Sequence, residues 1–463
     1  MNKLFELWIV KCLHRYMAAI CFLVVGLITM FSEWEHNKTY NYDSFGYHNY
    51  LPSAIIYNDL GYYNHMDSIV SKYRPTGNKL IRYGLHPCEN SDKLCNKYPI
   101  GVALFQAPLF LTAHASVQFN KEYPADGYSK PYQLSTRLSS LLFAFFGLVI
   151  LAHFLLRYFN WLTTSLVILC ISFGTNFLNY SAIESGLSHP YLFFLYSAVL
   201  LTTYKWYKGP TLYNSILLGV EIGLCTILRP IDILIALIPI LWGICNMETW
   251  GSIRNNIAYL GAALLAFIVI IIPQLFYWHY TSGNWIYFSY PANEFFIWNA
   301  PRIWDGLFSY RKGWFLYTPL ALLACTGLIF MKSGRISSGI KYSIITFFVV
   351  YVYVVFSWNN WFYGWSFGAR PMMQTYALLA LPLAFLLEKI LHFRPLFKSL
   401  TLGFFALLIY FNLFQNWQYR KGIISGDSMN HDWYWNNFMS TKAHPDNPSL
   451  LILQKEHDKT HGW

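Results

Sequence analysis

A carboxylate early in the chain is well placed to act as a general base. Asp43 lies in NYDSFGYHNYLP, shortly after the first apolar run and among several tyrosines. A carboxylate near a membrane surface can take a proton from a hydroxyl, and desolvation raises its pKa while nearby cations lower it. A solvated loop residue or a helix N-cap is the alternative, because Asp is favoured at such positions. On spacing alone, both interpretations stay open.

Two cations beside apolar segments could hold an anionic lipid group. Lys97 lies in NKYPIG, and Arg229 lies in CTILRPIDIL. A lysine at the start of a membrane-lying helix can offer its ammonium to a lipid phosphate, and an arginine between two spans is a functional candidate by default. Snorkelling without a ligand is the alternative for Lys97, and an ion pair with Asp232 is the alternative for Arg229.

Further cations lie beside aromatic and Gly-rich segments. Arg302, Arg311 and Lys312 occur in PRIWDGLFSYRKGWF, and Arg370 occurs in WFYGWSFGARP. Arg and Lys pair with phosphate, while Trp and Tyr faces stack on sugar rings, so the combination fits a glycophospholipid better than a peptide or an ion. The alternative is that these aromatic residues belong to the interfacial belt of the membrane and that the cations are ordinary surface charges.

Three more polar residues are weaker candidates. Glu184 and His189, in NYSAIESGLSHP, could bind a sugar hydroxyl or orient the acceptor. Asp59, in IIYNDLGYY, has turn formation as its stronger interpretation, because Asn-Asp-Leu-Gly is typical turn chemistry.

The elements that position these side chains belong to a membrane protein. Of the 463 residues, 55% are apolar and only 12% are charged, against about a quarter charged in a soluble domain. This composition excludes a soluble globular enzyme. Aromatic residues make up 20%, as expected where helix ends lie in interfacial belts. The net charge of +11 indicates basic cytoplasmic loops or sites that bind anionic lipid, and not the binding of nucleic acid.

We predict an all-α polytopic integral membrane protein with about eleven transmembrane helices and a cytoplasmic N-terminus. The first run, 17–31, follows basic residues and has no cleavage site after it, so it is a retained anchor. The other runs long enough to cross the bilayer are 138–156, 162–179, 190–206, 211–228, 231–247, 257–277, 314–331, 341–357, 371–387 and 396–414.

Segment 101–119 decides the sidedness of everything after it. It is apolar enough to span but contains Gln106, Pro108 and His114, and we place it as an interfacial helix on the outer side. The short inner connections are then compact and basic, as the positive-inside rule requires. The outer face carries a large first loop, about 32–136. If segment 101–119 spans, every later loop changes side.

Two cysteines and one carboxylate within a span complete the chemically notable residues. Cys88 and Cys95 lie together in the first outer loop, where an oxidising compartment would permit a disulfide, and two free thiols are the equal alternative. Glu221, near the middle of the fifth predicted span, is interpreted as a hydrogen-bonded structural carboxyl. No spacing of His and Cys suggests a metal.

In their order and common sidedness, four stretches resemble the GT-C polyprenyl-phosphate-sugar glycosyltransferases, a superfamily that includes the lipid A aminoarabinose transferase and the protein O-mannosyltransferases. The likeness covers 1–390, a GT-C-like module, and leaves 391–463 as the last transmembrane helix and an outer tail. The stretches are Asp43 with the following turn at Asp59, KYPIG at 97–101, Arg229 with Pro230, and the pair SYRKGWFLYTP at 309–319 and WFYGWSFGARP at 361–371.

The resemblance implies transfer of a sugar from a polyprenyl-phosphate donor to an acceptor hydroxyl on the periplasmic face of a bacterial inner membrane. It implies that Asp43 is the base and that Lys97 and Arg229, joined by Arg370, hold the donor phosphate. The acceptor would be a glycolipid, polysaccharide or protein; no cofactor is firmly implied and a divalent metal is not indicated. The expected substrate contacts are Asp59, Tyr98, Glu184, His189, Arg311 and Lys312.

One displacement would invert the anomeric carbon, so no second catalytic carboxylate is needed. The alternative is a lipid or polysaccharide transporter or flippase, which predicts charged residues along the spans at midplane depth. The predicted spans are nearly free of charge apart from Glu221, and the candidate residues gather at one face. This distribution favours the enzyme.

Overall fold

The protein is mostly helical, with one two-stranded sheet in the part of the chain that the structure describes. A computed structural model gives that part as residues 2–33, 39–77, 79–89, 91–245, 247–331 and 335–445, so the end of the predicted outer tail lies outside it. The longer helices are α1 (Asn2–Ser32), α5 (Gly101–Asn120), α6 (Lys130–Leu155), α7 (Trp161–Phe173), α8 (His189–Lys208), α9 (Leu212–Leu228), α12 (Ile257–Ser282), α16 (Ser338–Phe356), α17 (Tyr376–Leu391) and α18 (Pro395–Arg420).

The remaining elements are short. Those of the first loop are α2 (Asp43–His48), α3 (Tyr50–Ile55), α4 (Met66–Tyr73), β1 (Leu85–Pro87) and β2 (Leu94–Asn96). Those after it are η1 (Asn179–Ile183), η2 (Pro230–Ala236), α10 (Leu237–Ile244), α11 (Met247–Asn255), α13 (Ile303–Phe308), α14 (Trp314–Tyr317), α15 (Pro319–Thr326), η3 (Gly327–Phe330), η4 (Arg370–Thr375) and α19 (His431–Asn436).

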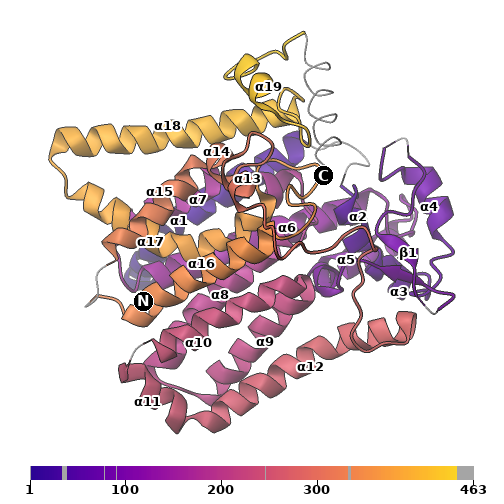
Figure 1. Cartoon of the computed structure of the whole chain (residues 1–463), viewed down its shortest axis with the longest axis horizontal. Coiled ribbons are helices and arrows are strands. Elements are labelled where there is room, and N and C mark those ends of the chain that lie inside the picture. Colours follow the sequence, from indigo (N-terminus) through magenta and orange to yellow (C-terminus); the bar gives the residue numbers. More distant parts are fainter. Residues whose placement is uncertain are drawn as a thin grey trace.

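The long helices form a bundle with two distinct ends. Helices distant in sequence pack side by side, including α6 with α8, α9 with α12, and α10 with α16. The N-terminus lies at one end of the bundle, and α2, α3, α4 and β1 gather at the opposite end (Figure 1). We call this the first-loop end.

Seven of the described helices are long and apolar enough to cross a membrane. They are α1 from His14 onward, α5, α6, α12, α16, the continuous segment Arg370–Leu391, and α18. Four further predicted runs fall on shorter apolar helices, and the run 190–206 falls on α8. The predicted all-α architecture is confirmed, with seven helices that could cross a membrane among the described residues, while the count of eleven spans stays a prediction.

The helix α5 is one of these seven, although the sequence analysis places 101–119 at the interface. Its first residue, Gly101, packs so closely on the backbone of Ile227 in α9 that a Cβ would overlap it. Near its other end, His114 Nδ1 lies 2.6 Å from the Tyr132 hydroxyl oxygen at the start of α6. Both ends of α5 therefore lie near the first-loop end of the bundle.

The break after α9 follows from its sequence. Thr211 caps the helix at its start by accepting a hydrogen bond from the Asn214 N–H. At the other end, Pro230 cannot continue the helix and disfavours helical backbone at Arg229, which adopts an extended conformation. The chain thus turns at the first-loop end and leaves the Arg229 side chain there.

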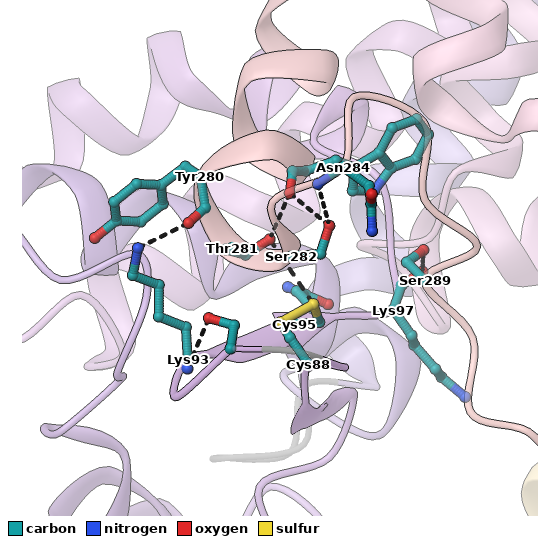
Figure 2. Close-up of a disulfide and its surroundings, with 12 residues drawn as sticks. Cys88, Lys93, Cys95, Lys97, Tyr280, Thr281, Ser282, Asn284 and Ser289 are labelled. Atoms are coloured by element: carbon teal, nitrogen blue, oxygen red, sulfur yellow. Dashed lines mark hydrogen bonds between the residues drawn. A yellow bond between two sulfur atoms is a disulfide. The ribbon is translucent and has the colours of Figure 1, made fainter.

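A disulfide closes the hairpin that precedes Lys97. Cys88 and Cys95 are bonded, which settles the alternative that the sequence left open. Thr281 Oγ1 at the end of α12 lies 3.8 Å from Cys95 Sγ, so the hairpin rests on that helix (Figure 2). Because β2 leads directly into Lys97, the disulfide helps to fix the position of this lysine.

We expect the free energy of unfolding of the double variant Cys88→Ser, Cys95→Ser to be about 2 kcal/mol lower than that of the wild type. The reason is that the disulfide closes a short loop and so restricts the unfolded chain of the wild type. Thermal unfolding in detergent, with and without reductant, measures this. Reduced wild type should match the variant, and Cys21→Ser, which changes an exposed free thiol, should match the oxidised wild type. Equal stability of all forms contradicts the prediction.

Glu221 is hydrogen-bonded as expected, and its structural role stays a prediction. It is buried between α8 and α9, where the Thr202 hydroxyl donates a hydrogen bond to its Oε1 at 2.9 Å. A hydrogen bond of this kind offsets part of the cost of placing a carboxyl among apolar helices.

Candidate functional site

Asp43 begins α2 at the first-loop end, and two partners orient its carboxylate. Its Oδ2 lies 2.5 Å from Arg370 Nη2, and the Tyr98 hydroxyl donates a hydrogen bond to Oδ1 at 2.5 Å. Burial raises the pKa of Asp43, but Arg370, Lys97 and the Tyr98 hydrogen bond together outweigh burial, so the pKa is lowered from its usual value. The carboxylate is therefore ionised and held in one orientation.

A glycine in α2 makes room for the Tyr98 ring. A Cβ on Gly46 would overlap this ring. The Tyr50 hydroxyl donates to the Tyr98 carbonyl at 2.6 Å, and Asn96 Nδ2 donates to the Gly46 carbonyl at 2.7 Å. These contacts hold α2 against the KYPIG segment and place the Tyr98 hydroxyl on Asp43.

Arg370 reaches Asp43 from a segment far away in the sequence. It begins η4 after a turn in which Gly368 has a φ of 60°, a conformation that glycine adopts without strain. The Arg370 N–H donates to the Gly368 carbonyl at 3.0 Å. The turn delivers the guanidinium to the first-loop end, where its side chain is 15% exposed.

Lys97 is paired with a carboxylate that the sequence analysis did not single out. Its Nζ lies 2.9 Å from Glu294 Oε1, and the two side chains are 12% and 21% exposed. The same ammonium lies 5.1 Å from the ring centroid of Tyr83, 5.2 Å from that of Tyr98 and 5.6 Å from that of Tyr290. A cation surrounded by aromatic faces is stabilised without losing its ability to bind an anion.

Arg229 forms the ion pair with Asp232 that the sequence left as an alternative. Its Nε lies 2.8 Å from Asp232 Oδ2, and its Nη2 donates to the Tyr351 hydroxyl at 2.9 Å. The fully buried Asp232 also accepts hydrogen bonds from Tyr196 at 2.6 Å and from Gln374 at 3.2 Å. Asp232 is thus fixed from several elements at once.

A hydrogen-bond network joins this pair to the Asp43 region. The Tyr351 hydroxyl donates to the Pro371 carbonyl at 3.1 Å, next to Arg370. His189, buried at the start of α8, has its Nδ1 3.1 Å from Gln374 Oε1. Arg229 is therefore connected, through Tyr351, to the backbone next to Arg370, whose side chain pairs with Asp43.

Glu184 lies close enough to Arg370 to interact with its charge. The Tyr419 hydroxyl donates to Glu184 Oε1, and Asn179 Nδ2 donates to Oε2 at 3.0 Å. Burial raises the pKa of Glu184, although both hydrogen bonds and the charges of Arg370 and Lys312 oppose this increase. The predicted contact Glu184 is thus near the site, held by a tyrosine from the end of α18.

Lys312 and Arg311 hold the later loops together. Lys312 is buried, and its Nζ donates to the carbonyls of Ser366 and Gly426. Arg311 Nε donates to the Asp427 carbonyl at 2.9 Å. These two residues connect the SYRKGWF segment to the loop before Arg370 and to the segment that follows α18.

The stability of the protein should depend on pH through Lys312. Burial lowers the pKa of Lys312 to about 7, whereas an unfolded lysine keeps a pKa of about 10.4. Between these values the unfolded chain binds more protons, so this lysine makes stability rise with pH. We expect the melting temperature of the wild type to rise relative to that of Lys312→Met from pH 7 to 10. Parallel melting curves across this range contradict the prediction.

Asp59 lies in a turn. Its carboxylate accepts hydrogen bonds from the backbone N–H groups of Tyr62 at 2.7 Å and Asn64 at 2.8 Å. This is the turn chemistry that the sequence left as the stronger interpretation. Contact of Asp59 with substrate stays a prediction.

Several residues of the site were missed at the sequence level. Glu294 lies in PANEFF, where an isolated loop carboxylate carries no signal. Tyr351 and Gln374 lie within apolar runs, and a polar side chain at that depth was the available signal. Tyr419 lies in the region predicted as an outer tail, and only the length of α18 brings it to Glu184.

The site as a whole combines three cations with three carboxylates. The pairs are Arg370 with Asp43, Lys97 with Glu294, and Arg229 with Asp232. If a carboxylate is displaced from one of these pairs, its Arg or Lys partner can bind a phosphate oxygen instead. Among the described residues, His, Cys, Asp and Glu side chains form no group of three or more that could hold a metal ion.

Fold and site together define a mostly helical protein with seven described helices that could cross a membrane and a charged, tyrosine-rich site at one end of its bundle. No family model and no curated protein matches the chain.

Proposed function

We propose that the protein is a membrane glycosyltransferase, which moves a sugar from a polyprenyl-phosphate donor to an acceptor hydroxyl. The observation that carries this proposal is an oriented, ionised carboxylate, Asp43, beside Lys97, Arg229 and Arg370 at one end of an apolar bundle. The apolar helices suit a polyprenyl chain, and the cations suit the phosphate that links this chain to the sugar.

The proposed reaction is a single displacement. The acceptor oxygen attacks the anomeric carbon, and the bond from this carbon to the phosphate oxygen breaks with its electron pair leaving on the phosphate. Lys97, Arg229 and Arg370 stabilise the charge on the departing phosphate. Asp43 takes the hydroxyl proton as the new bond forms. Its lowered pKa suits this role because the carboxylate is already ionised, and the attacking hydroxyl becomes acidic only as it bonds to carbon.

The proposed orientation places the first-loop end on the periplasmic side of a bacterial inner membrane, with a cytoplasmic N-terminus and about eleven spans. Both ends of α5 lie near this end, which supports an interfacial rather than a spanning position for this helix. A donor phosphate at headgroup depth would then meet Lys97 immediately before α5.

Substrate contacts are proposed for the remaining predicted residues in two groups. Tyr98 and His189 lie within the network around Asp43 and Arg229, close to the proposed phosphate position. Glu184, Arg311 and Lys312 form the second group. Lys312 binds the carbonyl of Gly426, which packs on the exposed Trp365 ring, and this ring offers a face for a sugar.

The alternative is a lipid or polysaccharide transporter, which requires charged groups along a path through the bundle. The charged pairs described above gather at the first-loop end, and Glu221 is engaged by Thr202. This distribution favours chemistry at one surface over movement across the bilayer.

The proposal is tested with purified protein in liposomes that contain a labelled lipid extract from bacterial membranes. Appearance of label in a glycolipid, polysaccharide or protein fraction supports a glycosyltransferase. Label that crosses the bilayer while it remains on its original lipid contradicts this function and supports the transporter. Liposomes without protein set the background for both measurements.

A further inference from the structure

The three carboxylates that neutralise the proposed phosphate ligands differ in the number of side chains that hold them in place. Asp232 is fully buried and accepts hydrogen bonds from Tyr196 and Gln374 besides its ion pair with Arg229. Asp43 is oriented by Tyr98 as well as by Arg370. In the described part of the chain, the only side-chain partner of the Glu294 carboxylate is Lys97.

Glu294 also lies on a different kind of element. Asp43 begins a helix and Asp232 lies in a 3-10 turn between helices, whereas Glu294 belongs to the loop between α12 and α13. The Ser289 hydroxyl of this loop donates to the Lys97 carbonyl at 2.9 Å, and Figure 2 shows Ser289 beside Lys97, whose ammonium extends away from the disulfide. Beyond Glu294, the Ile297 N–H donates to the Ser357 carbonyl at 2.6 Å.

We propose that Glu294 occupies the place of the donor phosphate on Lys97 and is displaced when the donor binds. This inference rests on the proposed function and identifies Glu294 as the residue that sets donor affinity. One Lys97 bond to a carboxylate oxygen is exchanged for one to a phosphate oxygen, and Glu294 turns toward solvent with the loop still anchored at Ser289 and Ile297.

Charge balance explains why one carboxylate must yield. Each cation of the site already carries one anionic partner, so three cations meet three carboxylates. A phosphodiester brings one further negative charge, and like charges confined in one site repel each other. Release of Glu294 restores the balance at the lowest cost, because this side chain is the most exposed of the three, at 21%, and gives up one partner.

The test compares binding of undecaprenyl phosphate and of undecaprenol, which lacks the phosphate, to the full-length protein in detergent. Glu294→Gln should bind the phosphate about fivefold more tightly than the wild type, because the competing anion is gone. Undecaprenol should bind both proteins equally. Asp305→Asn removes a carboxylate of α13 that pairs with Arg302, the residue before this helix, and thus controls for the change in net charge. Lys97→Met should lose most of the preference for the phosphate, because the two remaining cations, Arg370 and Arg229, stay paired with Asp43 and Asp232.

The outcomes separate this inference from the proposed function. Equal or weaker binding by Glu294→Gln, with the preference still lost in Lys97→Met, overturns the role of Glu294 and leaves the phosphate site in place. An equal gain in Asp305→Asn also overturns it, because net charge then explains the effect. If neither the wild type nor Glu294→Gln prefers undecaprenyl phosphate over undecaprenol, both the inference and the proposed phosphate site are overturned.

Discussion

Replacing Asp43 by Asn is expected to lower the rate of sugar transfer by about a hundredfold to ten-thousandfold, the range that a general base contributes. Asn has nearly the same size and still accepts a hydrogen bond from Tyr98, but it can neither take a proton nor pair with Arg370. The loss should therefore appear in kcat, while the donor KM stays equal or falls because Arg370 is released for the phosphate. Initial rates of label transfer by membranes at equal expression measure both.

Asp67→Asn is the matched control for this experiment. It removes an exposed carboxylate from the same loop, one that pairs with Arg82 and has no proposed role in transfer. Full transfer by the Asp43 variant would remove Asp43 as the base. Equal loss in both variants would indicate damage to the loop and not loss of a base.

Replacing Asp232 by Leu is expected to cost about 3–5 kcal/mol of unfolding free energy, because it leaves a mostly buried guanidinium without its counterion. The Arg229 side chain is 11% exposed, and the variant also removes an acceptor used by Tyr196 and Gln374. Thermal unfolding in detergent measures the loss. Glu388→Gln, which breaks the more exposed pair with Arg335, should cost at most about 1 kcal/mol.

The double variant Arg229→Met, Asp232→Leu separates stability from activity. Removal of both charges leaves no uncompensated ion, so much of the lost stability should return. If Arg229 is a phosphate ligand, sugar transfer should not return with it. A double variant as unstable as Asp232→Leu contradicts the counterion argument, and one with full transfer contradicts the phosphate role of Arg229.

The sequence was most informative where physical constraints are local. Apolar runs predicted the helices because a bilayer requires continuous apolar segments, and the separate runs 211–228 and 231–247 predicted the break after α9. The cysteine spacing of CENSDKLC allowed the disulfide, but oxidised and free thiols fit that spacing equally well, so only the three-dimensional contact decided between them.

The site was less predictable because its contacts are between distant segments. Asp43 and Arg370 were both candidates, yet no local pattern indicates that they pair. For Lys97 the sequence offered a lipid phosphate or snorkelling, and the partner in the structure is Glu294, almost two hundred residues away. Whether α5 spans the membrane or lies at the interface also depends on packing, because composition alone permits this helix to span.

The pairing of Asp43 with Arg370 has a consequence for the biogenesis of the protein. A chain made at about 5–20 residues per second leaves the Asp43 carboxylate without this cation for tens of seconds, while the intervening helices are synthesised and inserted. The tyrosine that holds Glu184 arrives later still, near the end of α18. A nascent chain that stalls or is truncated before its last helix would therefore carry an incomplete site, and activity would report that membrane insertion has finished.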